Sequence, residues 1–590
     1  MKLWIDSRRV QVAALMLGGL LAVASNSSAA EFAKSDGRPK VLGRKVANFV
    51  LPDASGKKVG LADFANRKII VVVLMGTQCP INNLFVTELE KLHGKYAAKG
   101  VQVLGVNANL ADSAQEVAKH VKEYKITFPV LKDASQQTLD LLGARRTPEV
   151  VVLDAGRRIR YRGRIDNRFG YTFKKKQAPR NDLLMAVDEL LAGKLVSVPE
   201  TEVMGCLITR REPITGAGKI TYTKHIAKLI QRRCQNCHHP NTAAPFSLLT
   251  YDDVSERAAM LKEVVIQRRM PPWHADPRYG HFSNDLRMKQ DEIDMLIGWI
   301  NSGMPRGDKK DLPPAKQYAD GWMIGKPDVV FKMPREFTVP ASGTVKYQYF
   351  LSKSNFKEDQ WVQAAEARPG NRAVVHHIIL FYRPNKGAQN HPFRRVGIVG
   401  TAPGEEPLVL PADTGFRIPA GSDLIWELHY TPIGKLQKDR SSVGIVFCKK
   451  PPKHEVRPQI AINSFFRIPP GAGNHQVKAS TRFRRDSLLL EMMPHMHLRG
   501  KDFLFRAIYP SGREETLLSV PSYDFNWQHT YRLAKPKRIP KGTVIECVAH
   551  FDNSTGNPAN PAPDKQVRWG NQTWEEMMIG FMKYVEEKPE

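Results

Sequence analysis

The chain has 590 residues, of which 42% are hydrophobic and 25% are charged. A chain of this length exceeds what one hydrophobic core supports, so three or four domains are expected, and the ordinary composition excludes a wholly disordered protein. The formal net charge of +29 favours an anionic membrane surface or an acidic partner, and six cysteines are too few for a disulfide scaffold.

The N-terminus has the three parts of a secretory signal peptide. The basic stretch MKLWIDSRR is followed by the apolar run VQVAALMLGGLLAVA and by SNSSAA, with Ala29 or Ala30 as the last residue removed. No later apolar stretch is long enough to span a bilayer. We therefore expect removal of residues 1–30 and a mature protein that is exported and soluble in a bacterial periplasm. In that compartment nucleic acid is not an expected partner.

Residues 31–205 alternate strand-like and helix-like segments, as α/β folds do. KIIVVVLMG (68–76) is a continuous apolar run, typical of a strand that is buried on both faces. A helical stretch follows at 82–100, and a second helix is expected at about 113–125. A hairpin with its turn at 154–156 closes the region.

One cysteine in this region has the setting of a reactive thiol. Cys79 follows the buried strand and opens a helix, whose N-terminus would stabilise a thiolate. Thr147-Pro148 matches the turn, usually cis, that faces the active thiol in thioredoxin-like folds. On these motifs the region resembles the thioredoxin and peroxiredoxin superfamily. It departs from the CxxC pattern at Asn82, and Thr77 lies one residue too close for the peroxiredoxin T-x-x-C.

A second cysteine lies just after this region. Cys206 is a candidate resolving partner for Cys79, which would make the pair the redox-active site. Two structural interpretations stay open beside this one: a static disulfide between the two cysteines, or a free buried thiol.

RRCQNCHHP (232–240) contains the C-x-x-C-H run that is typical of covalent haem attachment in exported proteins. Cys234 and Cys237 would form the thioethers, and His238 would ligate the iron. The alternatives are a redox CxxC or a zinc half-site, but zinc would need a second pair nearby, which the sequence lacks. We expect residues 206–312 to form an all-α c-type cytochrome domain carrying one haem.

The opposite axial ligand is expected from RRMPPWHADPRYGHF. Met270 precedes a double proline, which stiffens the loop after it. The segment resembles cytochrome c modules in which a methionine ahead of two prolines closes the haem, so Met270 is preferred. His274 and His281 compete with it, and Met260 is a more distant alternative.

From residue 313 onward, short strands separated by Pro/Gly turns predict two all-β, jelly-roll-like sandwiches, residues 313–450 and 451–590. Four strand-like segments of this region carry imidazole or thioether side chains. They are VVHHIILF with His376 and His377, IWELHYTP with His429, LEMMPHMHLRG with His495 and His497, and WGNQTWEEMMIGFM with Met577 and Met578.

These side chains form a ligand set for copper. His-x-His puts two rings on one face of a strand, whereas adjacent histidines converge only where the strand bends or bulges. Methionine is a soft ligand that suits Cu(I) and is poor for zinc. A single strand histidine is more often a hydrogen-bonded core residue, but four such segments in this order favour metal binding.

The order of these segments resembles the copper type II, ascorbate-dependent monooxygenases, peptidylglycine α-hydroxylating monooxygenase and dopamine β-monooxygenase. The resemblance implies two copper ions. The first would be held by His376, His377 and His429, and the second by His495, His497 and Met577, with Met578 as the fallback. The whole chain also resembles multi-domain bacterial proteins that join a redoxin, a cytochrome c and such a copper pair.

The sequence therefore predicts an exported copper-dependent monooxygenase that hydroxylates a C–H bond with O₂. Its substrate, a small molecule or a peptide, is not identified, and its own c-type haem, supplied by an electron donor, would relay electrons. Two alternatives remain: a copper and haem electron-transfer protein without oxygenase activity, or a periplasmic thiol-disulfide or peroxide reductase that uses Cys79.

Overall fold

The computed structural model describes residues 40–171, 173–175, 178–210, 219–240, 242, 244–318, 321–384, 395–401 and 406–587. The predicted signal peptide, residues 1–30, lies outside the described residues. Among the helices that are described, none is both long and apolar enough to cross a membrane.

The first region, called here the α/β part (residues 41–210), is built on a five-stranded sheet with the order β5-β4-β3-β7-β8. The strands are β3 (Ile69–Leu74), β4 (Val101–Asn107), β5 (Val130–Lys132), β7 (Glu149–Leu153) and β8 (Ile159–Gly163). The pairs β3–β4 and β4–β5 are parallel, and β7 and β8 are antiparallel to their neighbours. The hairpin turn at 154–156 is confirmed.

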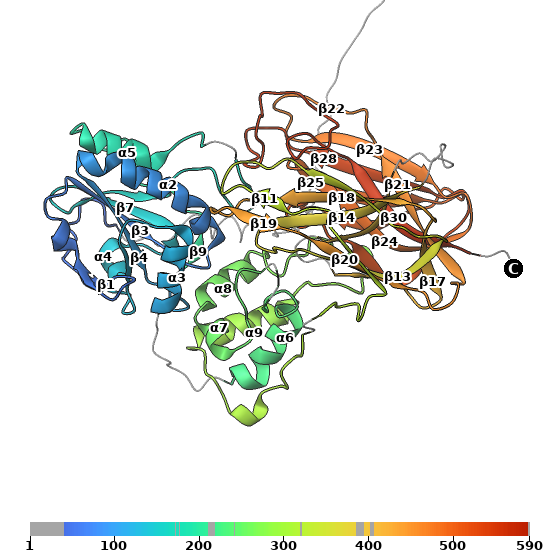
Figure 1. Cartoon of the computed structure of the whole chain (residues 1–590), viewed down its shortest axis with the longest axis horizontal. Helices are drawn as coiled ribbons and strands as arrows, with labels where there is room; N and C mark the ends of the chain where they lie inside the picture. The colour runs from blue at the N-terminus through green and yellow to red at the C-terminus, as the bar shows by residue number, and fades with distance from the viewer. Residues whose placement is uncertain are drawn as a thin grey trace, which may run out of the picture. The chain divides into compact units, whose positions relative to one another are not determined.

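Both faces of this sheet are covered, as the apolar run in β3 predicts. Ile69, Val71 and Val73 pack with α2 (Pro80–Tyr96) and α5 (Asp182–Leu191) on one face. The alternate residues of β3 pack on the other face with α4 (Gln137–Leu142) and β1 (Val50–Pro52) (Figure 1). The second expected helix is α3 (Ala114–Tyr124), and β2 (Lys58–Gly60) completes a hairpin with β1.

Residues 219–305, the helical part, contain one π-helical turn and four α-helices. They are η3 (Tyr222–Ile226), α6 (Ala227–Arg233), α7 (Tyr251–Ser255), α8 (Ala258–Ile266) and α9 (Gln290–Asn301). The fully buried Trp299 of α9 lies in their common core, where its indole contacts Tyr222 and Tyr251. Helices therefore dominate this segment, and the cytochrome domain expected here stays a prediction.

One segment of the helical part packs elsewhere. Trp273 and Phe282 lie in the core of the second sandwich, where their rings are 4.9 and 5.5 Å from the ring of Tyr531. Phe282 also forms a β-bridge with Leu533. The sequence gives no sign of this docking, because the segment reads as a Pro-rich loop between helices.

The first sandwich has the two packed sheets that its strand pattern predicts. One sheet has the order β12-β18-β14-β15, and the other contains β10-β20-β13-β17. Both contribute to one core around Trp426. The strands are β10 (Val329–Lys332), β12 (Gln348–Lys353), β13 (Gln360–Arg368), β14 (Val375–Arg383), β15 (Val396–Thr401), β17 (Thr414–Ile418), β18 (Asp423–Tyr430) and β20 (Ser442–Phe447).

The second sandwich repeats this plan around a core that includes Phe503 and Phe505. Its sheets have the orders β23-β28-β25-β26 and β21-β30-β24-β27. The strands are β21 (His454–Ile462), β23 (His475–Arg482), β24 (Ser487–His495), β25 (Gly500–Ile508), β26 (Glu514–Val520), β27 (Tyr531–Ile539), β28 (Val544–Phe551) and β30 (Ile579–Glu586). A two-residue parallel pairing between β17 and β21 makes one sheet continuous across both sandwiches.

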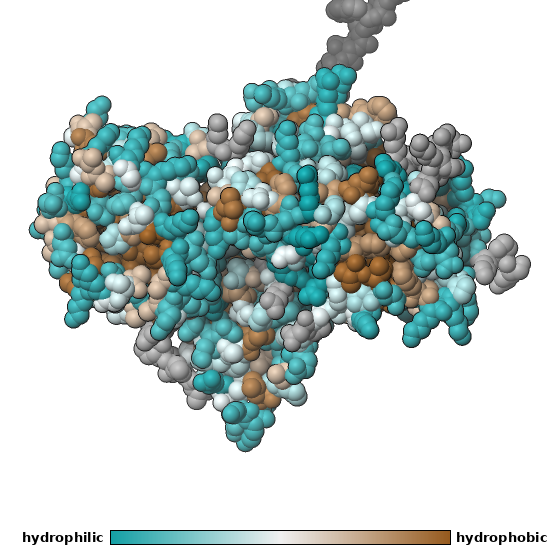
Figure 2. All heavy atoms as spheres, viewed as in Figure 1, coloured by the Kyte–Doolittle hydropathy of each residue, from teal (hydrophilic) through white to brown (hydrophobic). Residues whose placement is uncertain are grey.

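The visible surface is mostly hydrophilic, as expected for a chain in which 25% of the residues are charged. Figure 2 shows hydrophilic side chains over most of the visible face, with apolar patches between them. Large apolar side chains that are almost fully exposed are few among the described residues; Leu195 is 86% exposed and Phe465 is 95% exposed.

Two leucines of the α/β part allow a matched test of its core. Leu139 in α4 is fully buried, whereas Leu195 is 86% exposed. We expect Leu139→Ala to lower the local unfolding free energy by about 2–5 kcal/mol, because it leaves a cavity. Leu195→Ala should change it by less than about 0.5 kcal/mol. Hydrogen exchange of the β3 and β4 amides in the full chain measures both, and equal effects would contradict the assigned core.

Candidate active site

Cys79 lies at the junction of β3 and α2. The strand ends at Leu74, a short turn follows, and Cys79 is the N-cap of the helix, with Pro80 at its first position. The backbone N–H of Asn82 donates to Cys79 Sγ at 3.5 Å. A thiol in this position faces the unpaired N–H groups of the helix terminus, which favour a negative charge.

A buried aspartate holds the turn before Cys79. Asp112 accepts hydrogen bonds from the Thr77 backbone N–H at 3.0 Å and from its hydroxyl at 2.6 Å. The amide of Asn107, at the end of β4, donates to the same carboxylate at 2.6 Å. Because parallel strands end at the same edge of a sheet, the ends of β3 and β4 meet here. No sequence motif marks Asp112, and the polar residues that follow β4 are the available signal for it.

Cys206 approaches Cys79 from a short strand that lies outside the five-stranded sheet. It lies in β9 (Cys206–Leu207), which pairs antiparallel with β6 (Arg146–Thr147), so that Cys206 is opposite Thr147. The Thr147–Pro148 peptide bond is cis, as predicted. The Cys79 thiol donates to the Thr147 carbonyl oxygen at 3.0 Å. Both thiols therefore meet at Thr147.

The backbone at Gly205 is held close to β6. A Cβ at this position would overlap the Thr147 carbonyl, so only glycine allows the approach. Arg146 Nη1 and the Tyr171 hydroxyl donate to the Gly205 carbonyl oxygen at 2.9 and 2.8 Å. The Gly205 N–H in turn donates to the Tyr171 oxygen at 3.2 Å. These contacts fix the position of the next residue, Cys206.

The two thiols have opposite acid strengths. A hydrogen bond from the Cys206 side chain lowers the pKa of Cys79 to about 7, against the opposing effect of burial and with help from the Asn82 N–H. The same hydrogen bond, together with burial, raises the pKa of Cys206 well above its ordinary value. Cys79 is therefore the thiolate near neutral pH and Cys206 its proton-bearing neighbour, with both recorded as free thiols.

Comparisons with known proteins identify the region that contains Cys79. Residues 42–162 match the model of the AhpC/TSA family. Thiol-disulfide oxidoreductase ResA of Halalkalibacterium halodurans is 30% identical over 112 residues, which are 19% of this chain and 62% of ResA. The α/β part contains a thioredoxin-like redoxin domain.

Two further proteins are similar to part of this chain. ResA of Bacillus anthracis is 29% identical over 113 residues, or 19% of this chain and 64% of its own. A crystal structure of a hypothetical protein from Sinorhizobium meliloti matches 29% of this chain and 96% of its own, with 35% sequence identity and a TM-score of 0.27. The chain thus spans less than two thirds of the length of either ResA.

The prediction of a copper-dependent monooxygenase is wrong. The matched family and the two ResA proteins are redoxins and thiol-disulfide oxidoreductases. They support instead the thiol reductase that the sequence carried as an alternative. The histidine motifs of the last third are conspicuous in the sequence, whereas β9, which carries Cys206, has only two residues and leaves no pattern.

The residues predicted to hold haem lie together in the helical part. Cys234, Cys237 and His238 follow α6 and are all half-buried. His238 Nδ1 is hydrogen-bonded to the Phe246 carbonyl oxygen at 3.1 Å. Met270 packs against the same helical core as Cys234. Burial raises the pKa of Cys234 to about 12 and raises that of Cys237, so both are neutral thiols.

Met260 packs against the same core as Met270, whereas the two competing histidines contact the second sandwich. His274 is near His529, which is held against Trp273 and Trp527 in the second sandwich. The His281 carbonyl oxygen accepts a hydrogen bond from the backbone N–H of Ala534, a residue of that sandwich.

The first predicted histidine set converges. One ring nitrogen from each of His376, His377 and His429 lies within 4.8 Å of the others. His377 and His429 are cross-strand partners in β14 and β18, and a register shift between Val375 and His377 forms the bulge that an adjacent pair requires. Burial lowers the pKa of His376 to about 4. The Nδ1 atom of His429 is buried without a hydrogen-bond partner among the described residues.

The second predicted set lies at the end of β24. The rings of His495 and His497 are 5.2 Å apart. His495 Nδ1 is bonded to the Gln528 side-chain oxygen at 2.7 Å, and His497 Nδ1 to the Glu575 carbonyl oxygen at 3.1 Å. Met577 is half-buried. Met578, the fallback, is fully buried in the apolar core of the second sandwich.

The hydrogen bond between the thiols gives a direct test. With a pKa of about 7, Cys79 is mostly thiolate above that pH, so its alkylation by iodoacetamide should rise through a midpoint near pH 7. Cys206→Ala removes the main cause of the lowered pKa, and the midpoint should move to a higher pH. Mass spectrometry of the Cys79 peptide measures the rate at each pH.

Cys448→Ala is the matched control, because Cys448 lies in the first sandwich and contacts Gln363 and Thr414. It should leave the Cys79 midpoint in place. An unchanged midpoint in Cys206→Ala would show that Cys206 does not tune Cys79.

Proposed function

We propose that the chain is a thiol-disulfide oxidoreductase in which Cys79 attacks and Cys206 resolves. The observation that carries this proposal is that both thiols meet at Thr147: Cys206 is its cross-strand partner, and the Cys79 thiol donates to its carbonyl oxygen at 3.0 Å. Interaction with Cys206 there lowers the pKa of Cys79 to about 7. A thiol with a pKa near the ambient pH combines a large thiolate fraction with good nucleophilicity.

The reaction transfers two electrons from the protein to a substrate disulfide. The Cys79 thiolate attacks one substrate sulfur, the substrate S–S bond breaks, and one substrate thiolate leaves. Cys206 then loses its proton to solvent, or to that leaving thiolate, and attacks Cys79 Sγ. The mixed disulfide breaks, the second substrate thiolate leaves, and a Cys79–Cys206 disulfide remains. An external dithiol reduces it and completes the cycle.

This arrangement explains the absence of a second cysteine in the turn. Asn82 occupies the position of the second cysteine of a CxxC motif, is fully buried, and offers its backbone N–H to Cys79. The resolving thiol comes instead from β9, about 130 residues later, and approaches from the side of the cis Thr147–Pro148 bond.

A peroxide is the second substrate class for the same pair. Cys79 is only 4% exposed, which suits a small oxidant better than a large protein disulfide. Attack on a peroxide O–O bond would convert Cys79 to a sulfenic acid and release an alcohol or water. Cys206 would then form the same disulfide and release water.

We further propose that the three-histidine set binds copper, independently of any oxygenase chemistry. His376, His377 and His429 supply three ring nitrogens within 4.8 Å of one another, and the buried Nδ1 of His429 lacks another partner among the described residues. Copper, when bound, supplies one-electron redox chemistry. The proposed second copper site is His495, His497 and Met577, in which Gln528 and Glu575 orient the two rings.

We also propose one covalent haem in the helical part. Cys234 and Cys237 would form the thioethers and His238 would ligate the iron, because its Nδ1 is occupied by Phe246 and leaves Nε2 available. Met270 would be the opposite ligand. The group, when bound, supplies electron transfer. Export to the periplasm belongs to the same proposal, since covalent haem attachment is typical of exported proteins.

Substituting Cys79 and Cys206 one at a time distinguishes attack on the substrate disulfide from resolution of the mixed disulfide. We expect Cys79→Ser to reduce turnover of a model disulfide, such as insulin with a dithiol donor, to the background rate. Cys206→Ser should instead accumulate a mixed disulfide at Cys79, because nothing resolves it. Non-reducing mass spectrometry detects this species. The same variants assayed for hydrogen peroxide consumption decide between the two substrate classes, and full activity in Cys79→Ser would contradict both.

Metal and haem content test the cofactor proposals together. Mass spectrometry of metals should show that His429→Ala loses roughly one copper per chain, because the three-histidine set loses a ligand. His550→Ala is the matched control, since His550 Nδ1 is bonded to Asp502 at 2.6 Å. Cys237→Ser should lower covalent haem in the pyridine haemochrome spectrum. Copper content unchanged in His429→Ala would contradict the copper assignment.

A further inference from the structure

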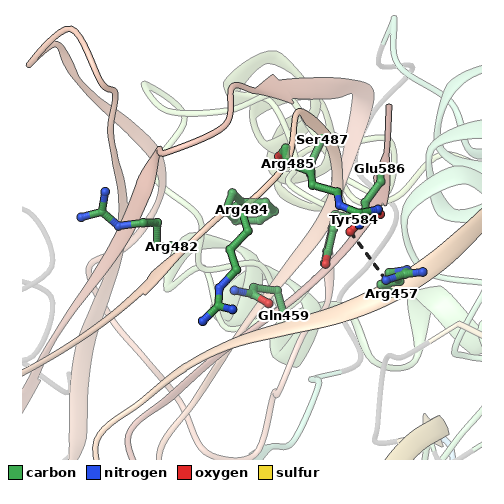
Figure 3. A pocket seen from close by; sticks show the side chains of 9 residues that line it. Arg457, Gln459, Arg482, Arg484, Arg485, Ser487, Tyr584 and Glu586 are labelled. Atoms are coloured by element: carbon green, nitrogen blue, oxygen red, sulfur yellow. Dashed lines mark hydrogen bonds and ion pairs between the residues drawn. The ribbon is translucent and has the colours of Figure 1, made fainter. Parts of the chain in front are cut away.

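A basic cavity lies in the second sandwich, away from the thiol pair and the histidine sets. Its volume is about 230 Å³. It is formed where β21 and β30 lie side by side next to the loop that follows β23. Figure 3 shows arginine side chains from β21 and from this loop around it. The lining includes Arg457, Gln459, Arg484, Arg485 and Glu586.

The single carboxylate in the lining is already shared. Glu586 pairs with Arg485 at 2.9 Å and with Arg457 at 3.6 Å. Arg457 also pairs with Glu455 beside the cavity at 2.7 Å. Four arginines line the cavity, the fourth being Arg482. Against Glu586 and Glu455 they leave two positive charges.

Arg484 carries one of these uncompensated charges. Its side chain is exposed, and neither it nor Arg482 makes an ion pair with any residue that the structure describes. In Figure 3 the Arg484 guanidinium extends toward Gln459, whereas Arg482 extends away from the group. The Gln459 amide donates to the Thr481 hydroxyl at 2.6 Å, which fixes its orientation and leaves one N–H to offer.

We propose that this cavity binds a phosphate-type oxyanion, with Arg484 and Arg457 as its charged donors and Gln459 as a neutral donor. The planar guanidinium fork matches the oxygens of phosphate. Arg484 brings an uncompensated charge, and Arg457, although it is paired with Glu455 and Glu586, adds further N–H donors. Cavities for drug-sized ligands measure about 300–1,000 Å³. This one is smaller, which suits a compact anion.

Two sources can supply such a group: free inorganic phosphate, or the headgroup phosphate of an anionic lipid. The chemistry of recognition is the same in both. The net charge of +29 would add long-range attraction to a membrane, but that attraction is shared by the whole surface and falls with salt. Anion binding at this cavity, unlike attraction by the whole surface, must weaken when Arg484 alone is replaced.

The test compares two exposed arginines of the second sandwich in the full chain. Arg484→Gln removes an uncompensated charge at the cavity. Arg513→Gln removes a charge from the turn between β25 and β26, where Arg513 is 63% exposed and lies 3.4 Å from Glu515. Calorimetric titration with inorganic phosphate, at ionic strength matched with chloride, measures affinity. Sedimentation with phosphatidylglycerol or phosphatidylcholine vesicles measures lipid binding. Circular dichroism melting confirms that each variant is folded.

We expect Arg484→Gln to weaken phosphate binding by about ten-fold or more, as loss of a charge-assisted hydrogen bond requires. Arg513→Gln should leave it unchanged. Binding of phosphatidylglycerol vesicles that depends on Arg484 and is displaced by free phosphate would identify the lipid as the source. Phosphate binding without vesicle binding would identify the free ion. Equal weakening by both variants, or no phosphate binding above chloride, would overturn the proposal.

Discussion

The meeting of Cys206 and Cys79 at Thr147 is the constraint on which the candidate site depends. It requires that a two-residue strand, β9, pair with β6, and that Gly205 approach the Thr147 carbonyl without a side chain. It also requires that the buried strand β3 deliver Cys79 to the same point. Because each element is held by the others, the acid strength of one thiol is set by residues spread over most of the redoxin domain.

Much of this site was readable from the sequence, but its assembly was not. The apolar run of β3, the cysteine at the start of a helix and the Thr147-Pro148 turn each follow a local rule, and the structure has all three. Cys206 could be nominated only by chain order, since a strand of two residues has no periodicity to detect. For Asp112 the sequence offers only the polar residues that follow β4, because its role depends on two strand ends that meet in the folded sheet.

In the last third of the chain, which holds the two histidine sets, local geometry could be predicted but activity could not. The adjacent pair His376 and His377 demanded a bulge, and the structure has one. Spacing therefore predicted geometry well, since ring convergence is a local consequence of strand pleat and register. The same spacing led to a wrong prediction of the activity. The types of ligand indicate which ion can bind. The reaction depends instead on which site of the chain binds a substrate, and the spacing of metal ligands does not indicate which site this is.

The docking of Trp273 and Phe282 into the core of the second sandwich sets a limit on how this chain can be divided. The Pro- and charge-rich stretch DKKDLPPAKQYADGW (308–322) suggests a linker after the helices, as if the helical part were a separate module. The two aromatic rings belong to another module's interior, beside Tyr531. A recombination joint at the linker would remove them and leave a cavity among apolar side chains. The helical part and the second sandwich therefore share one core, and the chain has fewer independently packed parts than its motifs suggest.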